Sequence, residues 1–117
     1  MKVREMRDVE RLYLRTMKKI EKEYDFAQEE INHINSDECM IDPEDIPEAI
    51  NDVLDYFESS AYELIRNADT KVGKFIGRSG LDPEVARMAY DIKNRLCRKP
   101  AHKLVDILDD RYRTYAE

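Results

Sequence analysis

Glycine and proline are scarce in this chain of 117 residues, which contains three of the first and four of the second. Tryptophan is absent, and cysteine occurs only at Cys39 and Cys97. So few glycines and prolines are unusual for β-rich or loop-rich folds, whose turns depend on these residues. Two cysteines are too few for the disulfide framework of a small secreted domain, so we expect two free thiols in a reducing cytoplasm.

Long apolar runs are also missing. No apolar stretch approaches the roughly 20 residues that cross a bilayer, and the charged N-terminal segment lacks the apolar centre of a secretory signal. Charged residues, by contrast, make up 39% of the chain, well above the usual quarter or so. Many charges and few helix breakers favour long helices in a cytoplasmic protein with no membrane contact, and the length suits a single domain over residues 1–117.

Apolar residues recur at helical spacing through most of the chain. From Met6 to Ile34 they follow one another at intervals of three or four residues, which predicts a helix over about residues 4–35. The same spacing predicts a second helix over about residues 43–77, where Asp42-Pro43 supplies a cap and a proline suited to the first turn. We expect the glycines that follow, at positions 77 and 80, to end this helix.

A second Asp-Pro pair, Asp82-Pro83, opens a third helical segment. Its expected buried face consists of Val85, Met88, Ala89, Ile92 and Leu96. Pro100 disfavours helical dihedral angles at Lys99, so we expect two pieces, over about residues 82–98 and 101–115. The sequence therefore predicts an all-α fold, a long antiparallel helical hairpin closed by a third helix that is broken near Pro100.

The net charge of −6 conceals a segregation of charge along the chain. Residues 1–20 carry +4, residues 21–63 carry −14, residues 64–103 carry +6 and residues 104–117 carry −2. In an antiparallel hairpin the two basic segments meet at one end, and the acidic segment forms the tip. The molecule should therefore be electrically polar along its long axis.

Leu14 and Phe26 fall off the apolar seam of the first helix by roughly a hundred degrees or more. Together with exposed tyrosines, of which Tyr62 is our candidate, they indicate a second contact surface, because tyrosine is enriched at interfaces. The leading hypothesis is a non-enzymatic helical protein–protein interaction module without a cofactor. Such a module would form a homodimer or serve as a small subunit or regulator of a larger complex.

Basic residues gather between positions 71 and 103. The candidates for contact with an anion or a nucleic acid are Lys71, Lys74, Arg78, Arg87, Arg95, Arg98 and His102. Several of them fall near one face if the third helix continues through Pro100, an arrangement that suits phosphates. The chain is acidic overall, however, and no aromatic residue interleaves the basic ones for base stacking. Nucleic-acid binding is therefore the alternative hypothesis.

Two residue pairs point to chemistry. Glu30 and His33 have the i, i+3 spacing of di-iron carboxylate bundles, although the second helix offers no matching histidine. Arg95 and His102 have the spacing of an Arg-x(4–6)-His motif, which resembles that of the HEPN ribonucleases, also small helical bundles. That resemblance implies ribonuclease activity at these two residues and gives a third, more remote hypothesis.

Overall fold

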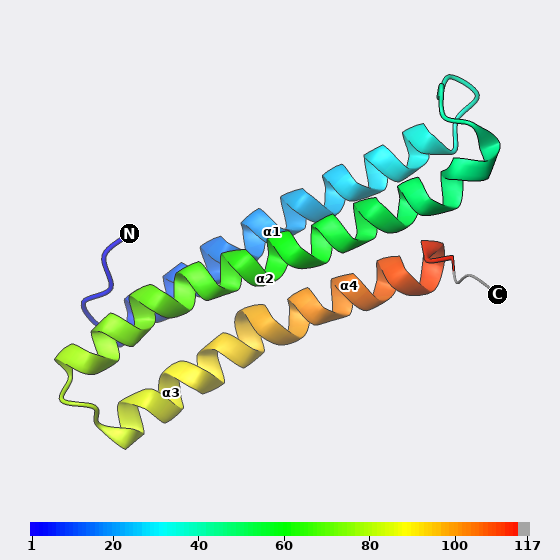
Figure 1. The fold of residues 1–117 in the computed structure, drawn as a ribbon. Coiled ribbons are helices and arrows are strands. Elements are labelled where there is room, and N and C mark those ends of the chain that lie inside the picture. The colour runs from blue at the N-terminus through cyan, green and yellow to red at the C-terminus, as the bar shows by residue number, and fades with distance from the viewer. Residues whose placement is uncertain (115–117) are drawn as a thin grey trace.

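The computed structural model describes residues 1–114, in which two long antiparallel helices are joined by a third that lies along them (Figure 1). The helices, in chain order, are α1 (Met6–Ile34), α2 (Ile46–Arg78), α3 (Pro83–Lys93) and α4 (Lys99–Tyr112). The Cα atoms extend over 57 × 28 × 17 Å, so the molecule is elongated along the hairpin. The predicted all-α hairpin with a third helix is confirmed. No helix in the described part of the chain is long and apolar enough to cross a membrane.

Local interactions explain where α1 begins. The carboxylate of Asp8 accepts hydrogen bonds from the backbone N–H groups of Arg4, at 3.0 Å, and Glu5, at 3.2 Å. The carboxylate of Glu5 in turn accepts a bond from the backbone N–H of Asp8, which completes a capping box. The pair satisfies donors that a helix start leaves without partners. The helix therefore begins at Met6, two residues after the predicted start.

The start of α2 also differs slightly from the prediction. Pro43–Asp45 forms one 3₁₀ turn, and the α-helix begins at Ile46 with Pro47 in its first turn. A proline is tolerated there because its missing N–H would have no helical partner in any case. The helix ends at Arg78, and Gly80 adopts a φ of 75°, a left-handed conformation that favours glycine.

The core lies where the three helices meet. The third helix contacts α1 along its length and contacts α2 mainly through α4. At mid-length the ring of Phe57 meets Tyr24 edge to face, with centroids 6.0 Å apart. The largest fully buried side chains are Tyr13, Ile20, Ile31, Leu54, Phe57 and Leu108. The seams predicted for α1 and α2 therefore supply most of the core.

The third helix is not broken at Pro100. Lys99 keeps helical dihedral angles, with φ −64° and ψ −47°, so the expectation that it leaves the helical region is wrong. Instead, Asn94–Arg98 forms a π-helical turn, in which the N–H of Lys99 bonds to the carbonyl of Asn94 five residues earlier. The wider turn relieves the clash between a proline ring and the preceding turn of an α-helix. The predicted interruption is thus a change of helical pitch.

The π turn also changes which residues face the core. Met88, predicted to be buried, is 44% exposed, and Leu96 is only half-buried, whereas Cys97 and Ala101 are fully buried. Cys97 follows Ala89 by eight positions, whereas two α-helical turns contain about seven residues. The π turn takes up the extra residue and returns the chain to the core side.

The end of the described chain is fastened to α2. The side chain of Asn51 exchanges two hydrogen bonds with the backbone of Thr114, at 2.8 and 3.1 Å. Arg113 pairs with Asp55 at 2.7 Å and with Asp109 at 3.1 Å. α4 ends at Tyr112, and Tyr115, with which the predicted helix ended, lies outside the described residues.

Candidate functional site

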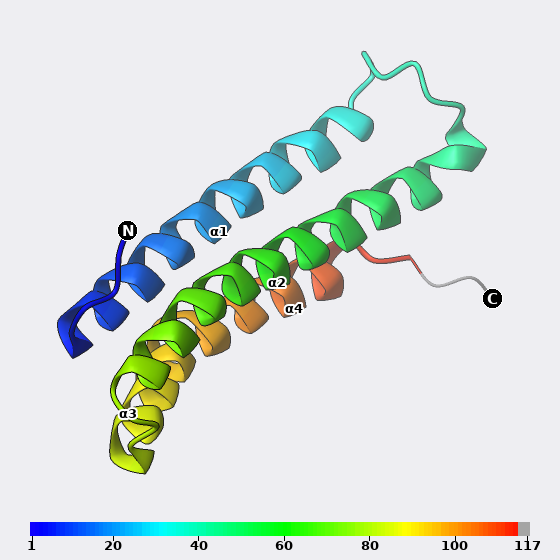
Figure 2. The ribbon, with the colours of Figure 1, turned by 60° about the vertical axis from the view of Figure 1, so that its left-hand side comes forward.

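The third helix leaves one side of the α1–α2 hairpin uncovered. Figure 2 views the hairpin from this side, with α4 behind α2. Hollows on it are lined only by α1, α2 and the loop between them, whereas those on the other sides include residues of the third helix. We call this side the open face. At 100° per residue its outward positions include Arg15, Lys19, Phe26, Glu30 and His33 on α1, and Asp52, Tyr56, Glu63, Lys71 and Lys74 on α2.

Two aromatic side chains lie at the same level of the open face. The hydroxyl of Tyr13 donates a hydrogen bond to Asp69. Position 26, thirteen residues later on α1, is therefore level with position 56, thirteen residues earlier on α2. Both rings are mostly exposed, Phe26 to 62% and Tyr56 to 69%. Exposed aromatic residues grouped on one face are typical of protein interfaces.

Cations gather at the end of the open face where α1 begins and α2 ends. Lys19, Lys71 and Lys74 line a hollow there. The pKa of the Met1 amine is lowered, chiefly by the charge of Lys71 and further by Arg15 and Lys19, so these groups lie close together. We call Arg15, Lys19, Lys71 and Lys74 the basic patch.

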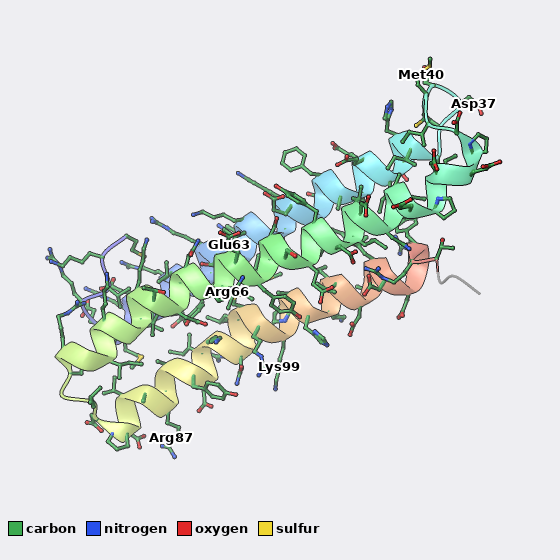
Figure 3. The ribbon with its side chains drawn as sticks, in the orientation of Figure 1. Asp37, Met40, Glu63, Arg66, Arg87 and Lys99 are labelled. Carbon is green, nitrogen blue, oxygen red and sulfur yellow. The ribbon has the colours of Figure 1, made fainter. Side chains whose placement is uncertain are left out.

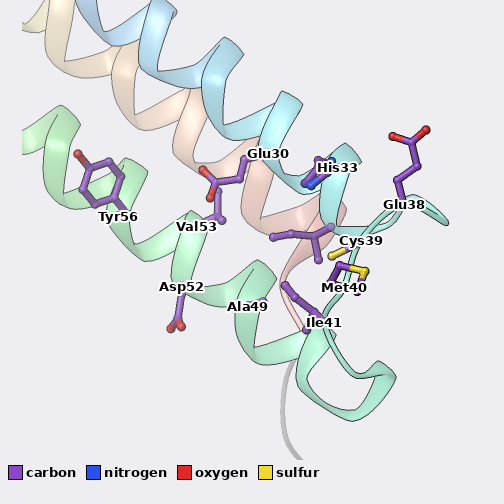
Figure 4. Close-up of a pocket in the computed structure, with 11 residues that line it drawn as sticks. Glu30, His33, Glu38, Cys39, Met40, Ile41, Ala49, Asp52, Val53 and Tyr56 are labelled. Carbon is purple, nitrogen blue, oxygen red and sulfur yellow. The ribbon is translucent and has the colours of Figure 1, made fainter.

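Three carboxylates lie around the opposite end, at the tip of the hairpin, with side chains that point in different directions (Figure 4). Glu30 of α1, Glu38 of the connecting loop and Asp52 of α2 line a pocket of about 660 Å³, and we call them the acidic patch. His33 lies in the same pocket, yet in residues 1–114 no three metal-ligating side chains are grouped so that they could hold a metal ion. The two ends of the open face therefore carry opposite charges.

Leu14, the other candidate interface residue on α1, does not share the open face. It is 43% exposed, but twelve residues separate it from Phe26, which turns it about 120° away around the helix. Glu21 and Asp25, which lie on the same side of α1 as Leu14, line the hollow between α1 and α4. The two apolar residues thus flank α1 on opposite sides.

Between α2 and α4 runs a groove of about 660 Å³, on a different side of the molecule from the open face. The hydroxyl of Tyr62 lies 3.1 Å from Nδ1 of His102, and Nε2 of the same imidazole lies 3.5 Å from the carboxylate of Asp106. The other lining residues are Arg98, Lys99 and Lys103. A candidate interface residue and two candidate anion contacts, assigned separately from the sequence, are thus brought together.

The seven candidate anion contacts do not form one continuous surface. Lys71 and Lys74 belong to the open face, whereas Arg98 and His102 line the groove between α2 and α4. A single phosphate backbone cannot follow both groups without crossing from one side of α2 to the other. The structure therefore divides the basic flank on which the nucleic-acid hypothesis depends.

The remaining three candidates have local partners or point elsewhere. Arg78 donates a hydrogen bond to the backbone carbonyl of Val3 at 2.5 Å, and Arg87 pairs with Glu84 at 2.5 Å. Arg87 projects away from α2, as Figure 3 shows. Arg95 is exposed and does not line the groove between α2 and α4, in which His102 lies. The two residues of the ribonuclease-like pair are therefore not brought together in that groove.

A polar cluster that the sequence did not reveal links all three helices. Oδ1 of Asp69 accepts a hydrogen bond from the Tyr13 hydroxyl at 2.6 Å, and Oδ2 accepts one from the Lys93 ammonium at 2.8 Å. Tyr13 is 2% exposed, and desolvation followed by the bond to Asp69 raises its pKa, so its hydroxyl stays protonated as a donor. Asp69 and Lys93 lie on helices rich in charge, where neither residue type gives a signal of its own.

Cys97 lies beside this cluster, and its thiol is expected to react slowly. It is fully buried, and burial together with the charge of Asp69 raises the pKa of its thiol to about 11. We expect iodoacetamide at pH 8 to alkylate the half-buried Cys39 about a hundredfold faster than Cys97, because only the thiolate reacts. Mass spectrometry of the Cys39→Ser and Cys97→Ser variants measures each rate. Equal rates in the folded protein would contradict this, and denaturant should abolish the difference.

Comparison of the chain with known protein families, curated proteins and solved structures gives no match. Its function is therefore argued from the open face and the groove alone.

Proposed function

We propose that this chain is a non-enzymatic helical interaction module that forms an antiparallel homodimer through its open face. The carrying observation is the order of groups along that face. Cations lie at one end, the level pair Phe26 and Tyr56 lies nearer the middle, and carboxylates lie at the other end. A surface with this order is complementary to its own copy in reverse orientation.

The expected symmetry follows from the charges. A two-fold axis in the plane of the interface and perpendicular to the helices places α1 over the partner's α1 in the opposite direction. Each basic patch then meets the partner's acidic patch, so both ends attract. A parallel arrangement would instead set like charges against each other at both ends. Electrostatic complementarity therefore favours the antiparallel dimer.

The size of the open face is sufficient for a specific dimer. The 29 residues of α1 span about 43 Å, and two neighbouring helices are about 20 Å wide. The projected area of the face is therefore close to the roughly 800 Å² per partner of a standard interface. Phe26 lies between Lys19 and Glu30 along α1, so its ring falls near the proposed axis and close to its own copy.

Phe26→Glu is expected to weaken the homodimer about thirtyfold. Each dimer loses two aromatic contacts, at about 1 kcal/mol for each partly covered ring. Sedimentation equilibrium at low ionic strength, over a range of protein concentrations, measures the dissociation constant. Leu14→Glu is the matched control, because it makes the same change in charge on the other flank of α1.

The proposal makes these two variants differ. Leu14→Glu should dimerise like the natural chain, and added salt should weaken both through the terminal contacts. A natural chain that stays monomeric at every concentration would end the proposal. Equal weakening by the two substitutions would move the interface away from the open face.

A further inference from the structure

The groove between α2 and α4 supports an inference that goes beyond dimerisation. We infer that this groove binds the phosphate monoester group of a small molecule, with Arg98, Lys99 and Lys103 as its cations. Tyr62 and His102 supply further hydrogen-bond donors. The groove lies on a different side of the molecule from the open face, so a dimer leaves it accessible.

The groove is cationic in an acidic protein. Its lining contains three permanent cations and one carboxylate, Asp106, whereas the whole chain carries a net charge of −6. Concave sites lined by charges of one sign concentrate oppositely charged ligands. A small anion near this surface is therefore drawn to the groove in preference to the surrounding acidic surface.

The helix spaces the cations at the scale of a phosphate group. Arg98 and His102 are four residues apart, and so are Lys99 and Lys103. Residues at this spacing lie on one side of a helix, one turn or about 5.4 Å apart. The guanidinium of Arg98 makes a long contact with Asn94, at 3.4 Å, and lies near the Tyr90 hydroxyl, but its five N–H donors leave some for an anion. Guanidinium and ammonium groups arranged in this way recognise phosphate oxygens through charge-assisted hydrogen bonds.

Tyr62 and His102 add hydrogen-bonding groups from both walls of the groove. Desolvation, with the charges of Glu58 and Asp106, raises the pKa of the Tyr62 hydroxyl, although Arg98 opposes the shift, so the phenol keeps its proton. With neutral imidazole, the phenol donates to Nδ1 and the proton on Nε2 points to Asp106. With imidazolium, Nδ1 donates to the phenol oxygen, and the phenolic hydrogen is free to turn toward an anion. The imidazolium form therefore offers an anion both a charge and a donor.

The surroundings favour a small ligand over a polynucleotide. A chain of phosphates that left the groove would meet Glu58 on α2 or the acids at the end of α4, and the basic patch lies on another side of the molecule. The cations of the groove occupy two adjacent turns of one helix, a span that suits one phosphate group. The ligand is thus a terminal phosphate group, not a phosphodiester backbone.

Titration of the isotopically labelled full chain with phenyl phosphate, followed by NMR at low ionic strength, tests this inference. We expect saturable shifts at residue 62 and over residues 98–106. Arg98→Gln combined with Lys99→Gln should weaken binding about a hundredfold, at about tenfold for each lost charge-assisted bond. Lys71→Gln combined with Lys74→Gln removes the same charge from the open face and should change the affinity by no more than about twofold.

A second titration isolates the role of the imidazole. Inorganic sulfate presents the same tetrahedral oxygens as a phosphate group and keeps a constant charge near neutral pH. We expect His102→Gln to weaken sulfate binding several-fold, because the variant loses a ring N–H donor from the groove. Tyr62→Phe should weaken binding several-fold while the spectrum elsewhere stays unchanged.

Several outcomes would overturn the inference. These are the absence of saturation, shifts spread over both faces, or equal weakening by the two double variants. Tighter binding of a ten-residue oligouridylate to the same residues would replace it with a nucleic-acid site. If the Arg98 and Lys99 double variant fails to fold, Lys103→Gln provides the same comparison, because that side chain is exposed on a regular turn of α4.

Discussion

Replacing both Lys19 and Lys71 with glutamate is expected to weaken the homodimer about a thousandfold. In the antiparallel arrangement each substitution alters a contact at both ends of the interface. Four contacts between opposite charges become contacts between like charges, and each change costs about a factor of five. Sedimentation equilibrium at low ionic strength measures the loss. The reverse variant, Glu30→Lys with Asp52→Lys, should fail to self-associate for the same reason.

The two variants should nevertheless bind each other. When they are mixed, each substituted end meets a partner end of mainly opposite charge, so both ends attract again. Attraction between the net charges of the two proteins does not explain such a complex, because both variants remain anions. Each substitution shifts the charge by two units, so the net charge changes from −6 to −10 in one variant and to −2 in the other. Recovery of the dimer only in the mixture is the expected result.

A control separates the patches from total charge. Arg87→Glu with Arg95→Glu makes the same change in net charge on the third helix, away from the open face. This variant should dimerise within a few-fold of the natural chain. If it loses the dimer as fully as the Lys19 and Lys71 variant does, the paired ends of the open face are not the cause.

Replacement of Asp69 with alanine is expected to lower the free energy of unfolding by about 3 kcal/mol. The carboxylate joins the buried Tyr13 hydroxyl to the Lys93 ammonium, whose side chain is only 22% exposed. Removal leaves a buried donor and a largely buried cation without partners, each costing about 1–2 kcal/mol. Urea denaturation monitored by circular dichroism measures the change. A Phe26→Glu background at low protein concentration disfavours the dimer, so that dissociation contributes little to the result.

Two further variants test the cause. Asp91→Ala removes an exposed carboxylate from the same region and should cost less than about 0.5 kcal/mol. Lys93→Met added to Asp69→Ala should recover about 1 kcal/mol, because the unpaired ammonium disappears. If the second substitution adds to the loss instead, the ion pair is not what makes Asp69 important.

The sequence could predict the elements of this fold because each carries its own signal. The apolar residues from Val9 to Ile34 can be recognised as one helix from their spacing alone. The capping role of Asp82 can be recognised from the proline that follows it. Its side chain indeed accepts a bond from the N–H of Glu84 at 2.9 Å. The cap predicted at Asp42 is wrong, because its side chain makes no capping bond and the α-helix begins only at Ile46. Local chemistry of this kind is visible in one segment at a time.

The phase of the third helix could not be predicted in the same way. Leu96 and Cys97 are neighbours, and either suits a core position by its apolar character. Cys97 is buried only because the helix widens around residues 94–98. A proline signals an interruption, but it does not say whether the chain bends, ends or changes its pitch.

Only some residues of the candidate sites were named from the sequence, and none as an arrangement. Lys99 and Lys103 of the groove and Tyr56 of the open face were not singled out, because nothing in the sequence distinguishes them from other exposed residues. Tyr62 and His102 are forty residues apart, and only the packing of α4 against α2 brings their side chains within 3.1 Å. The same packing separates Lys71 from Arg98, which the sequence had grouped. Which side of a helix meets which neighbour is decided by tertiary contacts, and one sequence does not contain that information in a readable form.

The π turn contains one more residue than a regular α-helical turn, as if a single codon had been inserted into the gene at this point. Its loss would turn all of α4 by about 100° relative to α3. Val105 and Leu108 would then leave the core, and His102 would leave Tyr62. The register of this helix therefore determines both the core and the groove, and a shift by one residue alters the two together.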